Sequence, residues 1–278
     1  MDEALLGNEH AKTAIDIACW DIFGKSVGIP ICDLHGGRTG VNLPIISSEY
    51  VGEPKEMRTR VAEHRRHDYM GHTIKVGSEP VADAACITAA LADKQPGEFF
   101  LVDANGRLTV ETALPLLRLL PVGLGFVLGG PCATWRECVS LQRRTNVPIC
   151  FDELATTDSS VIQLITDDAA DGIGMKISKN GGLTKCRHQR DSCLSIGYSI
   201  TVQDTVSSDI PVAAIVHIAQ TIPEKYLRCI LGTRDIVTVK TADGPFEIVE
   251  GRLSAPNLPG LGITPRLDVM GEPVSSYF

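Results

Sequence analysis

Short strand-like runs alternate with helix-like stretches along most of this 278-residue chain. Strands separated by helices of this length form parallel βαβ units. Eight such units over this span fit a closed (β/α)8 barrel, whose usual length is about 200 to 250 residues. The strand-like runs are Leu43–Ser47, His72–Val76, Phe99–Val102, Gly125–Leu128, Pro148–Phe151, Gly172–Ile177, Tyr198–Val202 and Tyr226–Leu231.

The stretches between these runs have helical periodicity. A doubly wound open sheet is the alternative arrangement, but no G-x-G-x-x-G or G-x-x-x-x-G-K-[ST] loop follows any strand, so its nucleotide-binding version has no support. The pattern therefore favours the barrel. The predicted helices are Pro54–Tyr69, Pro80–Ala92, Val110–Leu120, Thr134–Thr145, Ser159–Thr166, Leu183–Ile196 and Ile210–Thr221.

Both ends of the chain fall outside this repeat. Residues Glu9–Ser26 predict one amphipathic helix, which ends before Gly28 and Pro30. Near the other end, Asp243–Gly244 lies between two strand-like runs and is a hairpin signal, followed by a stretch rich in proline and glycine. We expect this tail to pack against the segment before the barrel, so that helix and hairpin form part of a second, smaller unit.

The charge and cysteine composition limit the kinds of molecule that this protein is expected to bind. The 34 acidic and 26 basic residues give a net charge of −8, which provides no general attraction to nucleic acid or to an anionic membrane. The nine cysteines include no C-x-x-C pair, and the first residues, MDEALLGNEHAK, have no secretory or transit pattern. We therefore expect a soluble, cytoplasmic protein with reduced thiols that acts on a small molecule; a homo-oligomer is left open.

Charged residues end several of the predicted strands, and the carboxyl ends of the strands are where a barrel carries its active site. Asp103 and Asp152 are two carboxylates there, the donors that Mg²⁺ prefers. Lys75 and Lys176 also end strands, on opposite sides of such a metal. This combination indicates abstraction of the proton next to a substrate carboxylate.

The motifs resemble the enolase superfamily, in its mandelate racemase and muconate lactonizing enzyme branch. The helix A-I-D-I-A-C-W-D-I-F-G-K is similar to the last helix of that family's α+β capping domain, and I-K-V-G, V-D-A-N-G, F-D-E, K-I-S-K-N-G-G and P-G-L-G-I are similar to its barrel signatures. The resemblance implies a division into a capping remnant (1–40), the barrel (41–235) and a C-terminal segment that returns to the capping domain (236–278).

The resemblance also implies the roles of individual residues. Lys75 and Lys176 would be the acid/base lysines, and Asp103 and Asp152 would be Mg²⁺ ligands. The family's third ligand is a glutamate that ends strand four, but this chain has Gly129 at that position.

The resemblance leaves the site incomplete in two respects. Glu153 follows Asp152 directly and is expected to point the other way, as alternate residues of a strand do, so it is a poor substitute for the missing glutamate. The resemblance also implies α+β structure before the helix at Glu9 that the 278 residues do not include, and we expect its loss to leave apolar surface in water.

Within the branch, F-V-L-x-x-P-C-A-T-W and G-M-K-I-S-K-N-G-G-L-T-K are similar to cis-3-hydroxy-L-proline dehydratases and hydroxyproline-betaine epimerases. The favoured prediction is dehydration of cis-3-hydroxy-L-proline, a cyclic amino acid whose ammonium would pair with Asp204 or Asp235. The alternatives are a racemase or epimerase of proline or hydroxyproline betaine, and a truncated homologue with little activity that acts as a structural or partner subunit.

Overall fold

The computed structural model describes residues 1–39, 42–49, 51–204, 208–232 and 237–276. Eight parallel strands pair in chain order, and β1 also pairs with β8, so the sheet closes into a barrel. This confirms the predicted fold class. The barrel strands are β1 (Leu43–Glu49), β2 (Gly71–Lys75), β3 (Phe99–Asp103), β4 (Val127–Gly129), β5 (Ile149–Phe151), β6 (Gly172–Lys176), β7 (Ser199–Gln203) and β8 (Leu227–Leu231).

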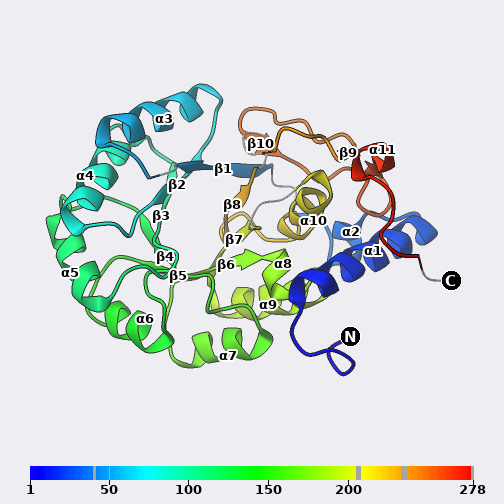
Figure 1. Cartoon of the computed structure of the whole chain (residues 1–278), viewed down its shortest axis with the longest axis horizontal. Helices are drawn as coiled ribbons and strands as arrows, with labels where there is room; N and C mark the ends of the chain where they lie inside the picture. The colour runs from blue at the N-terminus through cyan, green and yellow to red at the C-terminus, as the bar shows by residue number, and fades with distance from the viewer. Residues whose placement is uncertain (40–41, 50, 205–207, 233–236, 277–278) are drawn as a thin grey trace.

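Helices surround the barrel, and α3 to α7 form an outer arc around the strands (Figure 1). Their starts are set locally: α3 and α4 begin with proline in the first turn, while threonine side chains cap α5, α6 and α7. The helices are α3 (Pro54–Arg66), α4 (Pro80–Leu91), α5 (Val110–Leu119), α6 (Trp135–Gln142), α7 (Asp158–Thr166), α8 (Ile177–Asn180), α9 (Leu183–Ile196) and α10 (Asp209–Ala219).

Side-chain alternation along the strands separates two apolar regions. One set packs between the strands and the helices, whereas a small cluster that includes Ile46, Leu101 and Cys150 fills the barrel interior. Asp103 lies two residues beyond Leu101, and Asp152 lies two residues beyond Cys150. Asp103 therefore continues an inward-facing column at the carboxyl end of β3, and Asp152 directly follows the end of β5.

The chain leaves the barrel pattern after β8. Among residues 237–266, which the structure describes, no helix follows β8; the chain instead forms β9 (Ala242–Asp243), β10 (Arg252–Leu253) and β11 (Thr264–Pro265). Strand β10 pairs antiparallel with β1, and the short helix α11 (Leu267–Met270) follows β11.

The predicted hairpin at Asp243–Gly244 is wrong. Strand β9 pairs with β11, some twenty residues further along, and not with the strand-like run that follows Gly244. A two-residue Asp-Gly hairpin turn needs positive φ at both central residues. Neither Asp243 nor Gly244 is among the residues with positive φ, so the local turn does not form.

The N-terminal helix forms as predicted: α1 spans Glu9–Val27 and is followed by the short helix α2 (Ile31–Leu34). The tail packs against it, as expected. Leu261 donates its backbone N–H to Asp21 Oδ1 at 2.8 Å, and a Cβ on Gly24 would lie only 2.7 Å from Gly260 Cα. Figure 1 shows α1 and the C-terminal segment together, on the side of the molecule opposite α4 and α5.

Candidate active site

The first half of the site lies on neighbouring strands. Lys75 is the last residue of β2 and is in register with Asp103, the last residue of β3. The Lys75 ammonium lies 2.5 Å from Asp103 Oδ2 and donates to Asn105 Oδ1 at 2.8 Å. Asp103 Oδ1 accepts the backbone N–H of Asn105 at 3.0 Å, so the carboxylate is held from both sides. The Lys75 side chain remains 32% exposed at the mouth of the barrel.

The second half lies across β5 and β6. Asp152 follows the end of β5, and Lys176 is the last residue of β6. Their side chains form a direct ion pair, and each residue is only 7% exposed. Lys176 Nζ also lies 3.5 Å from Glu153 Oε1. The structure therefore brings each of the two predicted lysines onto one of the two predicted carboxylates.

The burial of this pair changes its ionisation. Burial raises the pKa of the Asp152 carboxyl to about 6; the Lys176 charge opposes that shift, and the negative charges of Glu153 and Asp103 add to it. Burial alone would lower the pKa of Lys176, but the charge of Asp152, its hydrogen bond and the charges of Glu153 and Asp103 outweigh it, so this pKa lies above its ordinary value.

The position of the missing ligand is occupied by backbone alone. Gly129 ends β4 and is in register with Asp103 of β3 and Cys150 of β5. A Cβ on Gly129 would lie 2.9 Å from Leu101 Cδ1, so a larger side chain there requires Leu101 to move. Within the part of the chain that the structure describes, no three His, Cys, Asp or Glu side chains already surround a point where a metal ion could sit.

The orientation predicted for Glu153 is wrong. Strand β5 ends at Phe151, so the alternation of a strand does not extend to Glu153. Its Oε1 accepts from Asn105 Nδ2 at 3.0 Å and lies 4.0 Å from Lys179 Nζ. Glu153 therefore faces the same site as Asp152.

The donor set that is present fits Mg²⁺. This ion prefers oxygen ligands and is commonly held by one or two carboxylates together with retained waters. Asp152 Oδ1 is buried and has no hydrogen-bond partner among the described residues, which is unfavourable for a carboxylate oxygen unless a cation or a water meets it. Asp103 and Asp152 are the residues that would hold the ion.

Of the two predicted substrate-binding acids, Asp204 is the one that the structure describes. Asp204 follows β7, is buried, and accepts a hydrogen bond from the Ser178 hydroxyl, which lies just beyond Lys176. Asp235 lies outside the described residues. Their role as counter-ions for a substrate ammonium stays a prediction.

Sequence reasoning missed the side chains that hold these groups in place. Asn180 accepts the backbone N–H of Lys176 at 3.0 Å, and its amide donates to Gln189 Oε1 at 2.5 Å and to the Ala155 carbonyl at 3.3 Å. Asn180 precedes Gly181 and Gly182, and a polar residue before two glycines by itself indicates only a turn. The available signal was an asparagine four residues after a strand-end lysine, because its amide can bind backbone groups of neighbouring loops.

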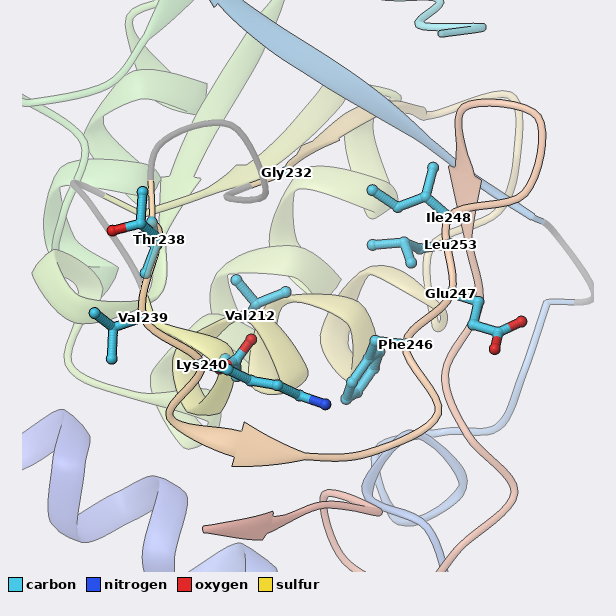
Figure 2. A pocket seen from close by; sticks show the side chains of 11 residues that line it. Val212, Gly232, Thr238, Val239, Lys240, Phe246, Glu247, Ile248 and Leu253 are labelled. Carbon is cyan, nitrogen blue, oxygen red and sulfur yellow. The ribbon is translucent and has the colours of Figure 1, made fainter. Parts of the chain in front are cut away.

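Two cavities lined by described residues differ in chemistry. One of about 160 Å³ is lined by Asn105, Gly130, Asp152 and Glu153, among others. A larger one of about 650 Å³ lies between α10 and the segment after β8 (Figure 2). Its wall is mainly apolar, and none of the described residues of the predicted site lines it. The smaller cavity is the one that belongs to the candidate site.

A closed barrel with paired lysines and carboxylates at its mouth defines an acid/base enzyme of barrel type. Comparison with known proteins then specifies the family. Residues 55–269 match the family described as enolase C-terminal domain-like, and residues 1–36 match the mandelate racemase / muconate lactonizing enzyme N-terminal domain. The chain belongs to the mandelate racemase/muconate lactonizing enzyme branch of the enolase superfamily.

Named relatives are lyases and isomerases. The chain is 36% identical over 277 residues to the cis-3-hydroxy-L-proline dehydratase of Roseibium aggregatum, a match that covers 100% of this chain and 75% of that protein. It is 27% identical to the N-succinyl-L-Arg/Lys racemase of Bacillus cereus, over 79% of this chain and 60% of that protein.

Solved structures agree with this assignment. A protein of the mandelate racemase/muconate lactonizing enzyme group from Aspergillus oryzae is 66% identical, with a TM-score of 0.97 over 99% of this chain and 76% of that chain. A member of the enolase superfamily from Roseovarius nubinhibens ISM, complexed with magnesium, is 31% identical, with a TM-score of 0.93 over 99% of this chain and 75% of that chain.

No helix in the described part of the chain is both long and apolar enough to cross a membrane.

Proposed function

We propose that this protein removes the α-proton of a small carboxylate substrate and that its reaction is the dehydration of cis-3-hydroxy-L-proline. The observation that carries the proposal is the pair of Lys–Asp contacts at the mouth of one barrel, Lys75 with Asp103 and Lys176 with Asp152. The similarity to the Roseibium dehydratase over the whole chain supports the choice of substrate.

The two lysines divide the proton transfers. One lysine, as the neutral amine, accepts the proton from C2 of the substrate. The electron pair left at C2 forms a C2–C3 double bond as the 3-hydroxyl departs, and the other lysine, as the ammonium, gives that hydroxyl a proton so that it leaves as water. The product is a pyrroline carboxylate.

The carboxylates have a separate role. When bound by Asp103 and Asp152, Mg²⁺ would supply positive charge next to the substrate carboxylate and so acidify the α-proton. Asp204, and Asp235 beyond the described residues, would pair with the ring ammonium of the substrate. These charges would orient a cyclic amino acid, and the protein would need no aromatic surface for it. A quaternary betaine would require such a surface.

A racemase or epimerase is the second candidate, because an ammonium on the opposite side of the site could return a proton to C2 when no 3-hydroxyl can leave. The N-succinyl-L-Arg/Lys racemase among the relatives supports it. The third candidate is a weakly active or inactive homologue that serves as a structural or partner subunit, and Gly129 favours it.

Product analysis separates these candidates. The purified chain would be incubated with Mg²⁺ and, separately, cis-3-hydroxy-L-proline, proline and hydroxyproline betaine, and the products would be identified by NMR. We expect loss of the 3-hydroxyl from the first substrate only. Inversion of proline or betaine without any dehydration would favour the epimerase. An unchanged chain without turnover, together with turnover in Gly129→Glu, would favour the inactive homologue.

A further inference from the structure

The space next to the missing glutamate is filled by another carboxylate. A Cβ at position 130 would lie 2.8 Å from Glu153 Oε2 and 3.8 Å from Asp103 Oδ1. Any side chain at this position would displace Glu153, and the backbone there has φ of +43°, a conformation that favours glycine. Gly130 therefore allows the Glu153 carboxylate to approach Asp103 over the end of β4.

The contacts of Glu153 leave its two oxygens in different surroundings. Asn105, Lys176 and Lys179 all approach Oε1, whereas Oε2 faces position 130. Glu153 also lines the cavity of about 160 Å³ that Asp152 lines. That cavity has room for an ion and retained waters, since one water occupies about 30 Å³.

A second observation points to a cation in the same place. Asp152 is 7% exposed, lines this cavity, and leaves Oδ1 without a hydrogen-bond partner among the described residues. A buried carboxylate oxygen without a partner is costly. A divalent cation held between Asp152 and Glu153 would satisfy it.

We propose that Glu153 supplies the third carboxylate ligand of the Mg²⁺ site, in place of the glutamate that Gly129 replaces. The inference rests on the proposed function, because it completes the site through which the α-proton would be acidified. The three carboxylates do not surround one point in this structure. Lys75 and Lys176 form ion pairs with Asp103 and Asp152 instead. Binding of the cation would then displace these ammonium groups from the carboxylates.

The test uses Mn²⁺ as the probe, with free Mn²⁺ counted by electron paramagnetic resonance and Mg²⁺ as the competitor, in the absence of substrate. Glu153→Gln keeps the shape of the side chain and removes its charge, so we expect the Mn²⁺ affinity to fall by roughly tenfold or more. Glu224→Gln, an exposed acid in the α10–β8 connection, is the matched control and should bind as the unchanged chain does.

Two further variants keep the test informative. Gly130→Ala removes no charge but pushes Glu153 away, and should also weaken Mn²⁺ binding. Adding Gly129→Glu to Glu153→Gln should restore it. Mn²⁺ binding that Glu153→Gln leaves unchanged, or no Mn²⁺ binding by the unchanged chain, would overturn the inference.

These results can be told apart from a failure of the proposed function. If the chain binds Mn²⁺ through Glu153 but dehydrates no substrate, the ligand assignment holds and the reaction is wrong. If cis-3-hydroxy-L-proline is dehydrated while Glu153→Gln binds Mn²⁺ normally, the reaction holds and the ligand assignment is wrong.

Discussion

The two lysines of the site are not equivalent. Lys176 is buried beside Asp152, whereas the Lys75 side chain is about one-third exposed beside Asp103. Removing either lysine leaves a buried carboxylate, since Asp103 is 4% and Asp152 7% exposed. Asp103 then keeps the backbone N–H of Asn105, whereas Asp152 Oδ1 has no hydrogen-bond partner among the described residues. The two lysines should therefore contribute similarly to catalysis but differently to stability.

We expect Lys75→Met and Lys176→Met each to lower kcat for dehydration by about 10²- to 10⁴-fold, the usual contribution of a positioned acid or base. Lys176→Met should in addition lower the free energy of unfolding by about 3 kcal/mol, because Asp152 stays buried without its partner. Urea unfolding of both variants would show this difference. The exposed Lys225→Met is the control, and equal stability losses in the two lysine variants would contradict the account.

Three buried histidines make stability depend on pH. Burial lowers the pKa of His35 to about 3 and those of His72 and His217 to about 4. A histidine in the unfolded chain takes up its proton near pH 6.5. Between about pH 6.5 and 4 the unfolded state therefore binds more protons than the folded state, and stability is lost as the pH falls through this window.

The contribution of one of these histidines to the pH dependence can be measured by substituting His217. Its Nδ1 accepts from the Cys32 backbone N–H at 3.2 Å and its Nε2 lies 3.1 Å from the Leu261 carbonyl, contacts that a glutamine amide can also make. Between pH 7 and 5, the unfolding free energy of His217→Gln should fall less than that of the unchanged chain. The difference should approach about 1.4 kcal/mol for each pH unit below about 6.5, because the variant lacks a histidine that only the unfolded state protonates there. The raised pKa of Asp152 acts in the opposite direction in both proteins and cancels. His10→Gln, an exposed site, should change nothing.

At the scale of elements, α1 fastens the turn that follows Lys176. Thr13 Oγ1 lies 3.2 Å from the Ile177 carbonyl, and Asp16 accepts from the backbone N–H of Thr184 at 3.1 Å and from its hydroxyl at 2.5 Å. A helix outside the barrel thus holds the segment between β6 and α9. These contacts begin one residue after Lys176.

We expect Asp16→Ala to lower the free energy of unfolding by about 0.5 to 1.5 kcal/mol, because the part-buried hydrogen bonds from the backbone N–H and the hydroxyl of Thr184 are lost. It should also lower kcat, since the turn after Lys176 is released. Asp16→Asn keeps an acceptor oxygen and should recover most of both losses. Calorimetry and steady-state kinetics would measure the two effects, and an Asp16→Ala variant with unchanged stability would count against this role for α1.

The regular elements could be predicted from sequence because their signals are local. The alternation of strand-like and helix-like runs identified the barrel, and strand ends then located Lys75, Asp103, Asp152 and Lys176. The pairing of β9 with β11 could not be found this way, because it depends on a partner distant in the chain. The same holds for Glu153, whose direction depends on where β5 ends and on the space at position 130.

At the scale of the whole molecule, the chain spans about three quarters of the length of the Roseibium dehydratase and of the solved relatives. One face of α1 is apolar and exposed: Ile15 is 55%, Ile22 68% and Phe23 48% exposed. These residues are seven and eight positions apart and so lie on one side of the helix. We propose that residues 1–40 and 236–278 together form a unit that packs against the barrel and contains this face.

This face should bind the apolar dye ANS in the native state. We expect the double variant Ile15→Lys/Ile22→Lys to lower native-state ANS fluorescence while its unfolding free energy changes by no more than about 0.5 kcal/mol, as for most surface substitutions. Val122→Lys, at an isolated exposed position, is the control and should leave the dye signal unchanged. A dye signal that persists in the double variant would place the exposed apolar surface elsewhere.

In the proposed site, two lysines flank a carboxylate-bound Mg²⁺ and exchange the α-proton of a cyclic amino acid. The most direct measurement is deuterium incorporation at C2 of proline, which has no 3-hydroxyl to lose, in deuterated water, followed by NMR with and without Mg²⁺. We predict incorporation that requires Mg²⁺ and is lost in Lys75→Met and Lys176→Met. Incorporation that persists after Mg²⁺ is removed, or that survives the loss of both lysines, would contradict the account.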